Sequence, residues 1–292
     1  MKKDKSTIVF NIISYIVIIF FALVAFLPFL ILFSSSISAN DYIVKYGYTI
    51  LPKQISFDAY RLVFAQPQKT LNAYGITLFL TVVGTLISTF LSSMAAYVMC
   101  RREVKYRNAM SFFIYFTTLF NGGLVAYFLT LSSVFHLRDT LLVLLLSPMF
   151  NAMFIIMLRN FIKTSVPEAL IEPARIDGAG DLRIFLQIVL PLAKASLATI
   201  GLFTALNYWN DWWTPMVFLY DDKLFPMQYL LYRILNSTNA TKDALTNVSS
   251  ISAPKETIKV AMTVIATLPI IVVYPFVQKY FVAGITVGSV KG

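Results

Sequence analysis

Charged residues are scarce in this sequence. They make up 13% of the 292 residues, against about 25% in an average soluble domain, while hydrophobic residues reach 58%, against about 45–50%. So few charges cannot cover the surface of an ordinary soluble protein, and the composition also excludes a disordered chain and a coiled coil. It predicts one all-helical domain that is embedded in a membrane.

Cysteine and histidine are nearly absent, with one residue of each type. Cys100 has no second cysteine for an internal disulfide, and His136 alone cannot complete a Cys/His cluster, so we expect no metal site. The sequence also lacks a glycine-rich phosphate-binding loop. We therefore expect neither catalytic residues nor a cofactor in this chain.

Long apolar runs are abundant instead. A bilayer core of about 30 Å needs roughly 20 apolar helical residues. Six segments meet this requirement: residues 8–33, 72–99, 108–131, 140–158, 192–219 and 258–277. The first follows three lysines and is longer than the apolar part of a signal peptide, which reaches about 15 residues, so we expect it to remain as a span.

The net charge of +10 is spread between these apolar segments and forms no single patch. This argues against nucleic acid as a partner, and it indicates membrane topology and contact with membrane lipid. With the N-terminus inside, the cytoplasmic stretches contain 14 Lys and Arg in 65 residues, and the outer stretches contain 10 in 87. The higher inner density predicts that both termini are cytoplasmic.

Several predicted spans contain helix breakers. Pro28 lies in the first span, and Pro148 lies in the fourth. Gly75 and Gly84 lie in the second, where we expect small residues to allow close helix packing. Asn121-Gly122-Gly123 in the third predicts a break that faces a cavity.

One predicted cytoplasmic connection, residues 159–194, is long and structured. Val166-Pro167-Glu168 is typical of a helix start, and Asp177-Gly178 is a turn signal because glycine accepts positive φ. A second amphipathic stretch follows and is kinked by Pro191. Its apolar positions are Leu182, Phe185, Leu186, Val189 and Leu190. The segment predicts a helical hairpin that docks on a soluble partner.

The same segment resembles the EAA loop of ATP-binding-cassette (ABC) importer permeases, in which Glu-Ala-Ala is followed by Gly, Ile and Leu-Pro at fixed intervals. The sequence keeps every interval, with Glu172, Ala174, Gly178, Ile188 and Leu190-Pro191. Pro173 replaces the second residue of the pattern. We expect it to change the start of the helix without loss of function, because proline is tolerated in a first turn.

Two further stretches resemble carbohydrate importers of this kind. Residues 207–215 resemble a Trp-Asn stretch in the fifth span, and residues 278–292 resemble the tail of the smaller maltose permease subunit; Phe120-Asn121-Gly122-Gly123 resembles Gram-positive oligosaccharide permeases. The resemblance covers the first span and most of the chain from about residue 72 onward. It divides the chain into a first span with an outer loop (1–71), a permease core (72–282) that contains the coupling loop (159–191), and a cytoplasmic tail (283–292).

The resemblance implies an all-helical, six-span subunit that moves oligosaccharides across the bacterial cytoplasmic membrane by alternating access. Its implied partners are a second, homologous permease in a heterodimer, two ATPase subunits that bind ATP and magnesium, and an extracytoplasmic sugar-binding lipoprotein that meets the outer loop 236–256. The residues implied to couple to the ATPases are Glu168, Glu172, Pro173, Ala174, Arg175, Asp177, Gly178, Leu190, Pro191 and Lys291.

A polar stripe in the fifth predicted span indicates a substrate path: Thr204, Asn207, Asp211 and Thr214. Their spacing of 3, 4 and 3 residues places them on one face of a continuous helix. Nearby aromatic residues form either an interfacial belt or stacking faces for sugar rings. We expect the belt for Trp213 and sugar contact for Trp209 and Asn210, although the partner permease could hold the substrate. The predicted path residues are Asn121, Asn207, Trp209, Asn210, Asp211 and Trp212.

Two other classes of function fit less well. An ion-coupled secondary transporter uses acids in mid-bilayer and often internal repeats, and the sequence has almost none of the former and no clear example of the latter. A membrane-embedded enzyme needs a polar catalytic cluster, which we do not find. Within the importers, the solute could also be a peptide, an amino acid or an anion.

Overall fold

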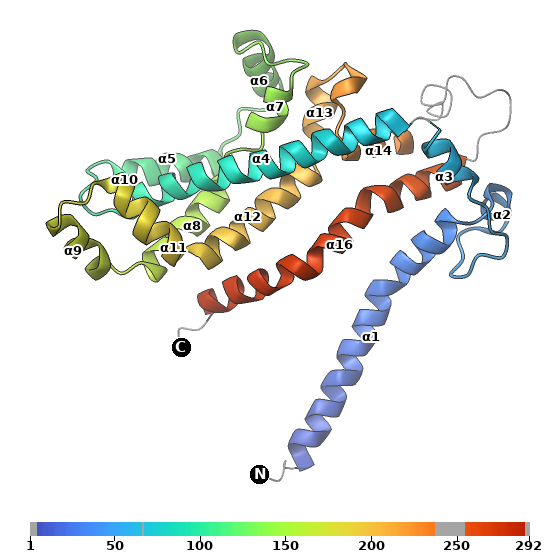
Figure 1. The fold of residues 1–292 in the computed structure, drawn as a ribbon, viewed down its shortest axis with the longest axis horizontal. Helices are drawn as coiled ribbons and strands as arrows, with labels where there is room; N and C mark the ends of the chain where they lie inside the picture. Colours follow the sequence, from blue (N-terminus) through green and yellow to red (C-terminus); the bar gives the residue numbers. More distant parts are fainter. Residues whose placement is uncertain (1–4, 66, 237–254, 290–292) are drawn as a thin grey trace. The chain divides into compact units, whose positions relative to one another are not determined.

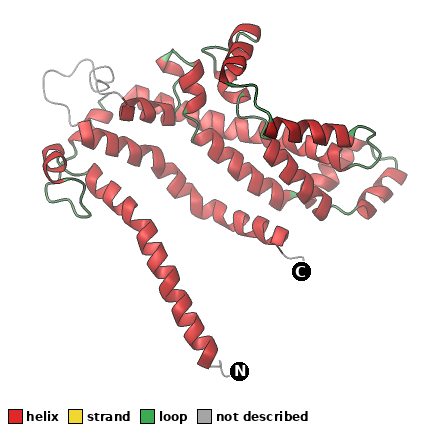
Figure 2. Ribbon diagram, turned by 180° about the vertical axis from the view of Figure 1, so that it is seen from behind, coloured by secondary structure: helices red, strands yellow, loops and turns green. Residues whose placement is uncertain are grey.

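The computed structural model describes residues 5–65, 67–236 and 255–289, and every regular element in these ranges is a helix (Figures 1 and 2). The only strand-like pairing in these ranges is one bridge between Ser38 and Ile55. The chain divides into two units, residues 1–70 with 231–269 and residues 71–230 with 270–292. The predicted all-helical class is therefore confirmed.

The first unit is dominated by the apolar helix α1 (Lys5–Ser36), which continues through Pro28 without a break. No side chain from residue 7 to residue 33 is buried, as expected of a helix that faces lipid or another subunit. The short helices α2 (Asn40–Tyr46) and α3 (Asp58–Val63) follow. The Tyr60 hydroxyl donates to Ser36 Oγ at 2.9 Å, which ties α3 to the end of α1.

The second unit contains most of the other helices. Its first half comprises α4 (Pro67–Cys100), α5 (Arg107–Leu119), α6 (Leu124–Leu129), η1 (Thr130–Val134), α7 (Leu141–Leu146) and α8 (Ala152–Ser165). Its second half comprises η2 (Glu168–Leu170), α9 (Ile171–Ile176), α10 (Asp181–Ile184), η3 (Phe185–Val189), α11 (Leu190–Leu192), α12 (Lys194–Trp209), α13 (Trp213–Phe218) and η4 (Asp222–Leu224). Three of the described helices cross the division between the units: α4 in its first turn, α14 (Met227–Asn236) and α16 (Lys255–Ser289).

The core of the second unit lies where α4, α8, η3 and α12 meet. Leu158, Val189 and Ile200 are completely buried there. The ring of Phe185 stacks on that of Tyr97, with 5.6 Å between the centroids. Helix α8 contacts both α5 and α12, and Figure 1 shows these helices running along one another. The packing therefore anchors η3 directly on the long helices.

Three helical segments are long and apolar enough to cross a membrane: Thr7–Ser36, Pro67–Cys100 and Glu256–Pro275. Two bent pairs raise the number to five if each pair is one span. One pair bends by 116° between α5 and α6, at residues 120–123, where Gly123 has a φ of 84°. The break predicted from Asn121-Gly122-Gly123 is confirmed, and the cavity beside it stays a prediction.

The predicted span over residues 140–158 is not one continuous helix. Helix α7 ends at Leu146 and α8 begins at Ala152, with Pro148 between them. Proline lacks an N–H and clashes with the preceding turn. Asn151 then starts α8, because its side-chain oxygen accepts the N–H groups of Met153 and Phe154 at 3.0 and 3.2 Å.

The two glycines of α4 differ in their surroundings. A Cβ on Gly84 would overlap the Tyr208 ring and lie 2.7 Å from Cε1, whereas a Cβ on Gly75 would meet nothing within 4 Å. Close packing against a small residue is therefore confirmed at Gly84 and wrong, within the described chain, at Gly75. Helix α12 approaches α4 through this tyrosine.

Candidate functional site

The candidate coupling site is the hairpin from Glu168 to Pro191, which lies at one end of the second unit (Figure 1). We call this the hairpin end. Its first arm is the 3-10 turn η2 followed by α9. Pro173 is the third residue of α9, where the backbone N–H has no acceptor within the helix. The departure from the resembled pattern therefore removes no helical hydrogen bond, and Pro173 is exposed together with Glu172 and Ile176.

The turn of the hairpin is a Schellman motif. The Ala179 N–H donates to the Ala174 carbonyl, and the Gly178 N–H donates to the Arg175 carbonyl, both at 2.9 Å. Gly178 has a φ of 81°, the left-handed conformation that this motif requires. The predicted glycine turn is therefore confirmed.

The second arm comprises α10, the π-turn η3 and α11. Ile184, Phe185 and Val189 are buried against the core. Leu182 and Leu186 are 60% and 43% exposed, so these two apolar positions are not buried within the described chain. The wider π-turn shifts the register relative to a 3.6-residue helix, which moves the buried stripe. The chain then bends by 83° into α12, just after Pro191.

Glu103, in the connection between α4 and α5, binds the first arm. Arg175 donates from both terminal nitrogens, and the Nη2–Oε2 distance is 3.1 Å. Arg101 donates to the same carboxylate from Nε at 3.1 Å. The hydrogen bonds from Arg175, the largest cause, lower the pKa of Glu103 to about 2. The same contact raises the pKa of Arg175, so both partners are charged near neutral pH.

Two further ion pairs join this connection to the hairpin. Arg101, which is only 13% exposed, also pairs with Asp181 at the start of the second arm. Arg102 Nε lies 3.3 Å from Glu168 Oε2 at the start of the first arm. Three consecutive residues, 101–103, therefore contact both arms of the hairpin.

The roles of Arg101, Arg102 and Glu103 are not predicted from the sequence. Basic residues after a predicted span are first a topology signal, and that interpretation hides their pairing. A usable signal exists, because an Arg-Arg-Glu run at one membrane edge faces a hairpin with complementary charges. The sequence alone does not show which charges meet, since the partners are up to 80 residues apart.

At the opposite end of α12, the predicted polar stripe is interrupted. Helix α12 ends at Trp209 and α13 begins at Trp213, so Asp211 and Thr214 do not continue the face of Asn207. Pro215 explains the break, since its ring would clash with the carbonyl of Asp211 four residues earlier. Asp211 instead accepts the backbone N–H of Thr214 at 3.0 Å and helps start α13. The prediction of one continuous face is therefore wrong.

The predicted path residues have different exposures. Asn207, Asn210 and Asn121 are exposed and Asp211 is half-buried. Trp209 is only 7% exposed, so its face is not open to a sugar in this conformation, whereas Trp212 is 40% exposed. Their part in a substrate path stays a prediction.

One of these residues, Asn121, and one neighbour, Tyr208, have structural contacts. Asn121 accepts the Gly123 N–H at 2.8 Å and so shapes its own turn. Tyr208 is buried, and its hydroxyl donates to the Leu145 carbonyl at 2.7 Å.

Two other predictions concern the end of the chain and the outer loop. Residues 237–254, which include nearly all of the loop expected to meet a binding protein, lie outside the described residues, as does Lys291. The predicted tail from residue 283 begins inside a helix, because α16 continues to Ser289. The described part of the tail is therefore helical.

Comparisons with known proteins agree with this architecture. The model of the family described as "Binding-protein-dependent transport system inner membrane component" matches residues 88–287. The polygalacturonan/rhamnogalacturonan transport system permease protein YtcP of Bacillus subtilis is 39% identical over 284 residues, which cover 97% of this chain and 98% of that protein. Protein LplC of the same organism is 34% identical over 292 residues, which cover 100% of this chain and 98% of that protein.

A solved structure is also similar. It belongs to a bacterial ABC transporter involved in the import of the acidic polysaccharide alginate. One of its chains matches with a TM-score of 0.80 and 34% sequence identity, and the match covers 96% of this chain and 99% of that chain.

Proposed function

Because the chain belongs to the family of binding-protein-dependent transport system inner membrane components, we propose that it is the permease subunit of an oligosaccharide importer that is driven through the hairpin. The family is one of ABC importer permeases, multi-pass proteins of the cytoplasmic membrane that have no enzymatic activity of their own. ATP is hydrolysed on partner subunits.

The observation that carries the coupling proposal is the construction of the hairpin. Its turn is fixed by Gly178, its second arm is buried in the core, and its first arm is held through Arg175 and Glu168. A displacement of the exposed tip would therefore be transmitted to α4 and α12, because the hairpin is held firmly by these contacts. This is the rigidity that transmission of force from an ATPase requires.

The tip also carries an apolar side chain that is exposed in the described part of the chain. Ile176 is 86% exposed, between Arg175, which pairs with Glu103, and the exposed Asp177. An exposed apolar anchor in a polar surround is typical of a docking surface. We infer that Ile176 and its exposed neighbours Glu172 and Pro173 contact the ATPase.

Copurification tests the docking surface. Ile176→Asp should greatly reduce the amount of ATPase that copurifies with the tagged chain, while membrane insertion is retained. Leu51→Asp is the matched control, because Leu51 is 76% exposed in a loop of the first unit. Equal ATPase recovery with both variants would contradict the docking role.

The finer arrangement follows the family resemblance. We propose six spans with both termini cytoplasmic, a heterodimer with a second permease, and two ATPase subunits at the hairpin end. An extracytoplasmic lipoprotein would deliver the sugar to the opposite end, and tail residues 283–292 would form a second ATPase contact. Deletion of residues 287–292 should lower uptake while leaving assembly intact; uptake at the unaltered level would show that the tail is dispensable.

The substrate that we propose is an acidic oligosaccharide. This rests on similarity, since one relative is named for polygalacturonan and rhamnogalacturonan and the solved transporter imports alginate. Uronic acids give such sugars negative charge at each carboxylate. Uptake of labelled galacturonate oligomers, compared with neutral oligomers of equal length, tests the proposal. Uptake of the neutral oligomers alone would contradict it.

We propose that the exposed polar residues at the Trp209 end of α12 line the substrate path. Asn207 and Asn210 offer amide groups to sugar hydroxyls, and Trp212 offers an exposed ring face. Trp209 and Asp211 would hold the residues of this surface in position. Trp212→Ala should change sugar selectivity more than Trp209→Phe, which preserves a buried ring.

A further inference from the structure

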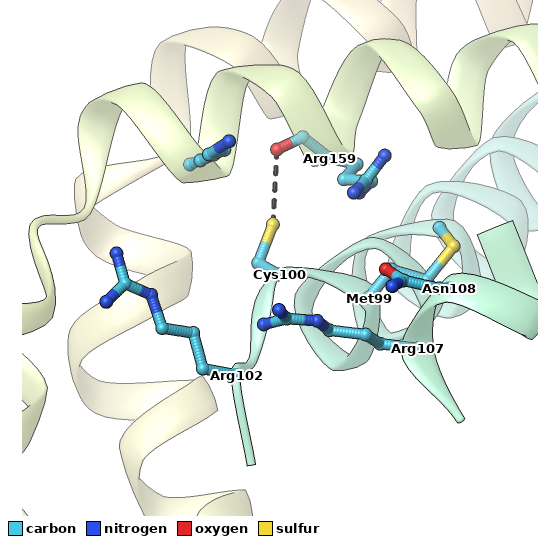
Figure 3. Close-up of a pocket in the computed structure, with 7 residues that line it drawn as sticks. Met99, Cys100, Arg102, Arg107, Asn108 and Arg159 are labelled. Atoms are coloured by element: carbon cyan, nitrogen blue, oxygen red, sulfur yellow. Dashed lines mark hydrogen bonds between the residues drawn. The ribbon is translucent and has the colours of Figure 1, made fainter. Parts of the chain in front are cut away.

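A small basic pocket lies between the end of α4, the start of α5 and the second half of α8, close to the hairpin contacts (Figure 3). Its volume of about 150 Å³ is several times the roughly 30 Å³ that one water molecule occupies in the liquid. The lining residues are Met99, Cys100, Arg102, Arg107, Asn108, Arg159 and Lys163. Four of these residues are cations and none carries a carboxylate, so the pocket suits an anion.

Most of the positive charge in the pocket is not neutralised. Among the residues that the structure describes, the side chains of Arg107, Arg159 and Lys163 form no ion pair. The Nε atom of Arg159 is buried and has no hydrogen-bond partner in the same part of the chain. A buried donor left without a partner is costly, which makes a bound acceptor favourable. Arg102 differs, because it pairs with Glu168 and so links the pocket to the hairpin.

The start of α5 adds positive potential. Arg107 and Asn108 are its first two residues, and the preceding Tyr106 provides no side-chain cap, although the Arg107 N–H donates to the Val104 carbonyl at 3.2 Å. Such a helix start attracts anions. The walls of the pocket are joined by the Cys100 thiol, which donates to the Arg159 carbonyl at 3.2 Å (Figure 3). The pocket therefore combines a helix start, a cavity and a buried unpaired donor.

We propose that this pocket binds a phosphate-type anion, either the headgroup phosphate of an anionic phospholipid or free inorganic phosphate. The lipid source rests on the proposed orientation, in which the hairpin end meets the inner leaflet, where basic pockets between helices bind lipid headgroups. The tendency of cytoplasmic loops to be basic explains the presence of cations at this end. It does not explain why they converge on a cavity with a buried donor.

Binding to the purified full-length chain tests the proposal. The protein in a neutral detergent is offered dioleoylphosphatidylglycerol, dioleoylphosphatidylcholine or inorganic phosphate at constant ionic strength, and native mass spectrometry and thermal unfolding report binding. R107Q/R159Q removes two pocket cations. K105Q/R183Q is the matched control, because it removes two cations near the same end that do not line the pocket.

We expect phosphatidylglycerol or inorganic phosphate to bind R107Q/R159Q at least about tenfold more weakly than the control, because charge-assisted hydrogen bonds are lost. Binding of phosphatidylglycerol alone identifies a lipid, and binding of inorganic phosphate alone identifies the free ion. Equal losses in both double variants, or no binding of either anion to the unaltered chain, would overturn the proposal.

One further variant keeps the test decisive if R107Q/R159Q does not fold. K163Q changes an exposed residue at the pocket rim and should weaken binding of the same anion. Unchanged binding to a folded K163Q protein counts against the pocket. Because the assay does not measure transport, its outcome is independent of whether the chain imports oligosaccharides.

Discussion

The hairpin end of the second unit differs from the opposite end of α12, which we call the Trp209 end, in the partners that the polar groups bind. At the hairpin end, charges from distant parts of the sequence pair with one another, as Arg175 does with Glu103. At the Trp209 end, backbone groups are the partners: Asp211 accepts the nearby N–H of Thr214, and the Tyr208 hydroxyl donates to the distant Leu145 carbonyl. Ion pairs therefore hold the hairpin to the connection between α4 and α5, whereas at the Trp209 end Asp211 shapes a local break and the amides of Asn207 and Asn210 stay exposed. Under the proposed function, the hairpin end would transmit movement and the Trp209 end would present a surface to the sugar.

The largest effect is expected at the hairpin turn. Gly178→Val places a β-branched residue at a φ of 81°, which costs roughly 1–2 kcal/mol or more. Gly180→Val is the matched control, because Gly180 has an ordinary φ of −68°, and a Cβ at either glycine meets nothing within 4 Å. We expect Gly178→Val to lose most ATP-driven uptake while inserting normally. Equal uptake by the two valine variants would show that the turn does not determine coupling.

At the Trp209 end, the largest effect is expected from packing. Gly84→Ala forces a Cβ into the Tyr208 ring, and overpacking of this kind destabilises by about 1–3 kcal/mol. Gly75→Ala in the same helix should not destabilise, because its surroundings are open. Thermal unfolding in detergent measures both variants. Tyr208→Leu should partly restore the Gly84→Ala protein, and the lack of any such non-additivity would contradict direct contact.

The ion pairs at the hairpin end predict a measurable coupling energy. Glu103→Gln and Arg175→Gln should each loosen the hairpin, and the double variant should be less unstable than the sum by about 0.5–1 kcal/mol. Hydrogen exchange of residues 168–181 reports the loosening. Asp41→Asn, which removes a carboxylate from α2 in the first unit, should leave exchange in the hairpin unchanged. Simple additivity would mean that the two residues act independently.

The same contact determines an acid response. Because the pKa of Glu103 falls from an ordinary 4.5 to about 2, its contribution is complete above pH 4.5 and is lost as the pH falls toward 2. Hairpin protection should therefore not change between pH 7 and pH 5. Below pH 4.5 it should weaken in the unaltered chain more than in Glu103→Gln. An equal response of both proteins would assign the acid sensitivity to other groups.

The two ends also show what the sequence can predict. The hairpin is predictable because its signals are local: Pro167 at a helix start, Gly178 at the turn, and Pro191 before the bend. The partners of its charges are not predictable, because nothing in residues 101–103 indicates which distant side chains they meet. At the Trp209 end, a periodic pattern of polar residues is misleading, since a 3.6-residue period assumes an unbroken helix. Pro215 carries the contrary signal, and it outweighs the spacing.

The smallest effect is expected at Asp211, where charge and shape can be separated. Asparagine also accepts a backbone N–H well at a helix start, so Asp211→Asn should keep the contact with Thr214 and change stability by no more than a few tenths of a kcal/mol. Asp211→Ala loses the contact and should cost about 1 kcal/mol. Thermal unfolding separates the two variants, and uptake of charged and neutral oligosaccharides then reports on the path. A change of selectivity in the stable Asp211→Asn protein would mean that its charge acts on the sugar. Unchanged uptake in that variant would leave Asp211 as the residue that starts α13.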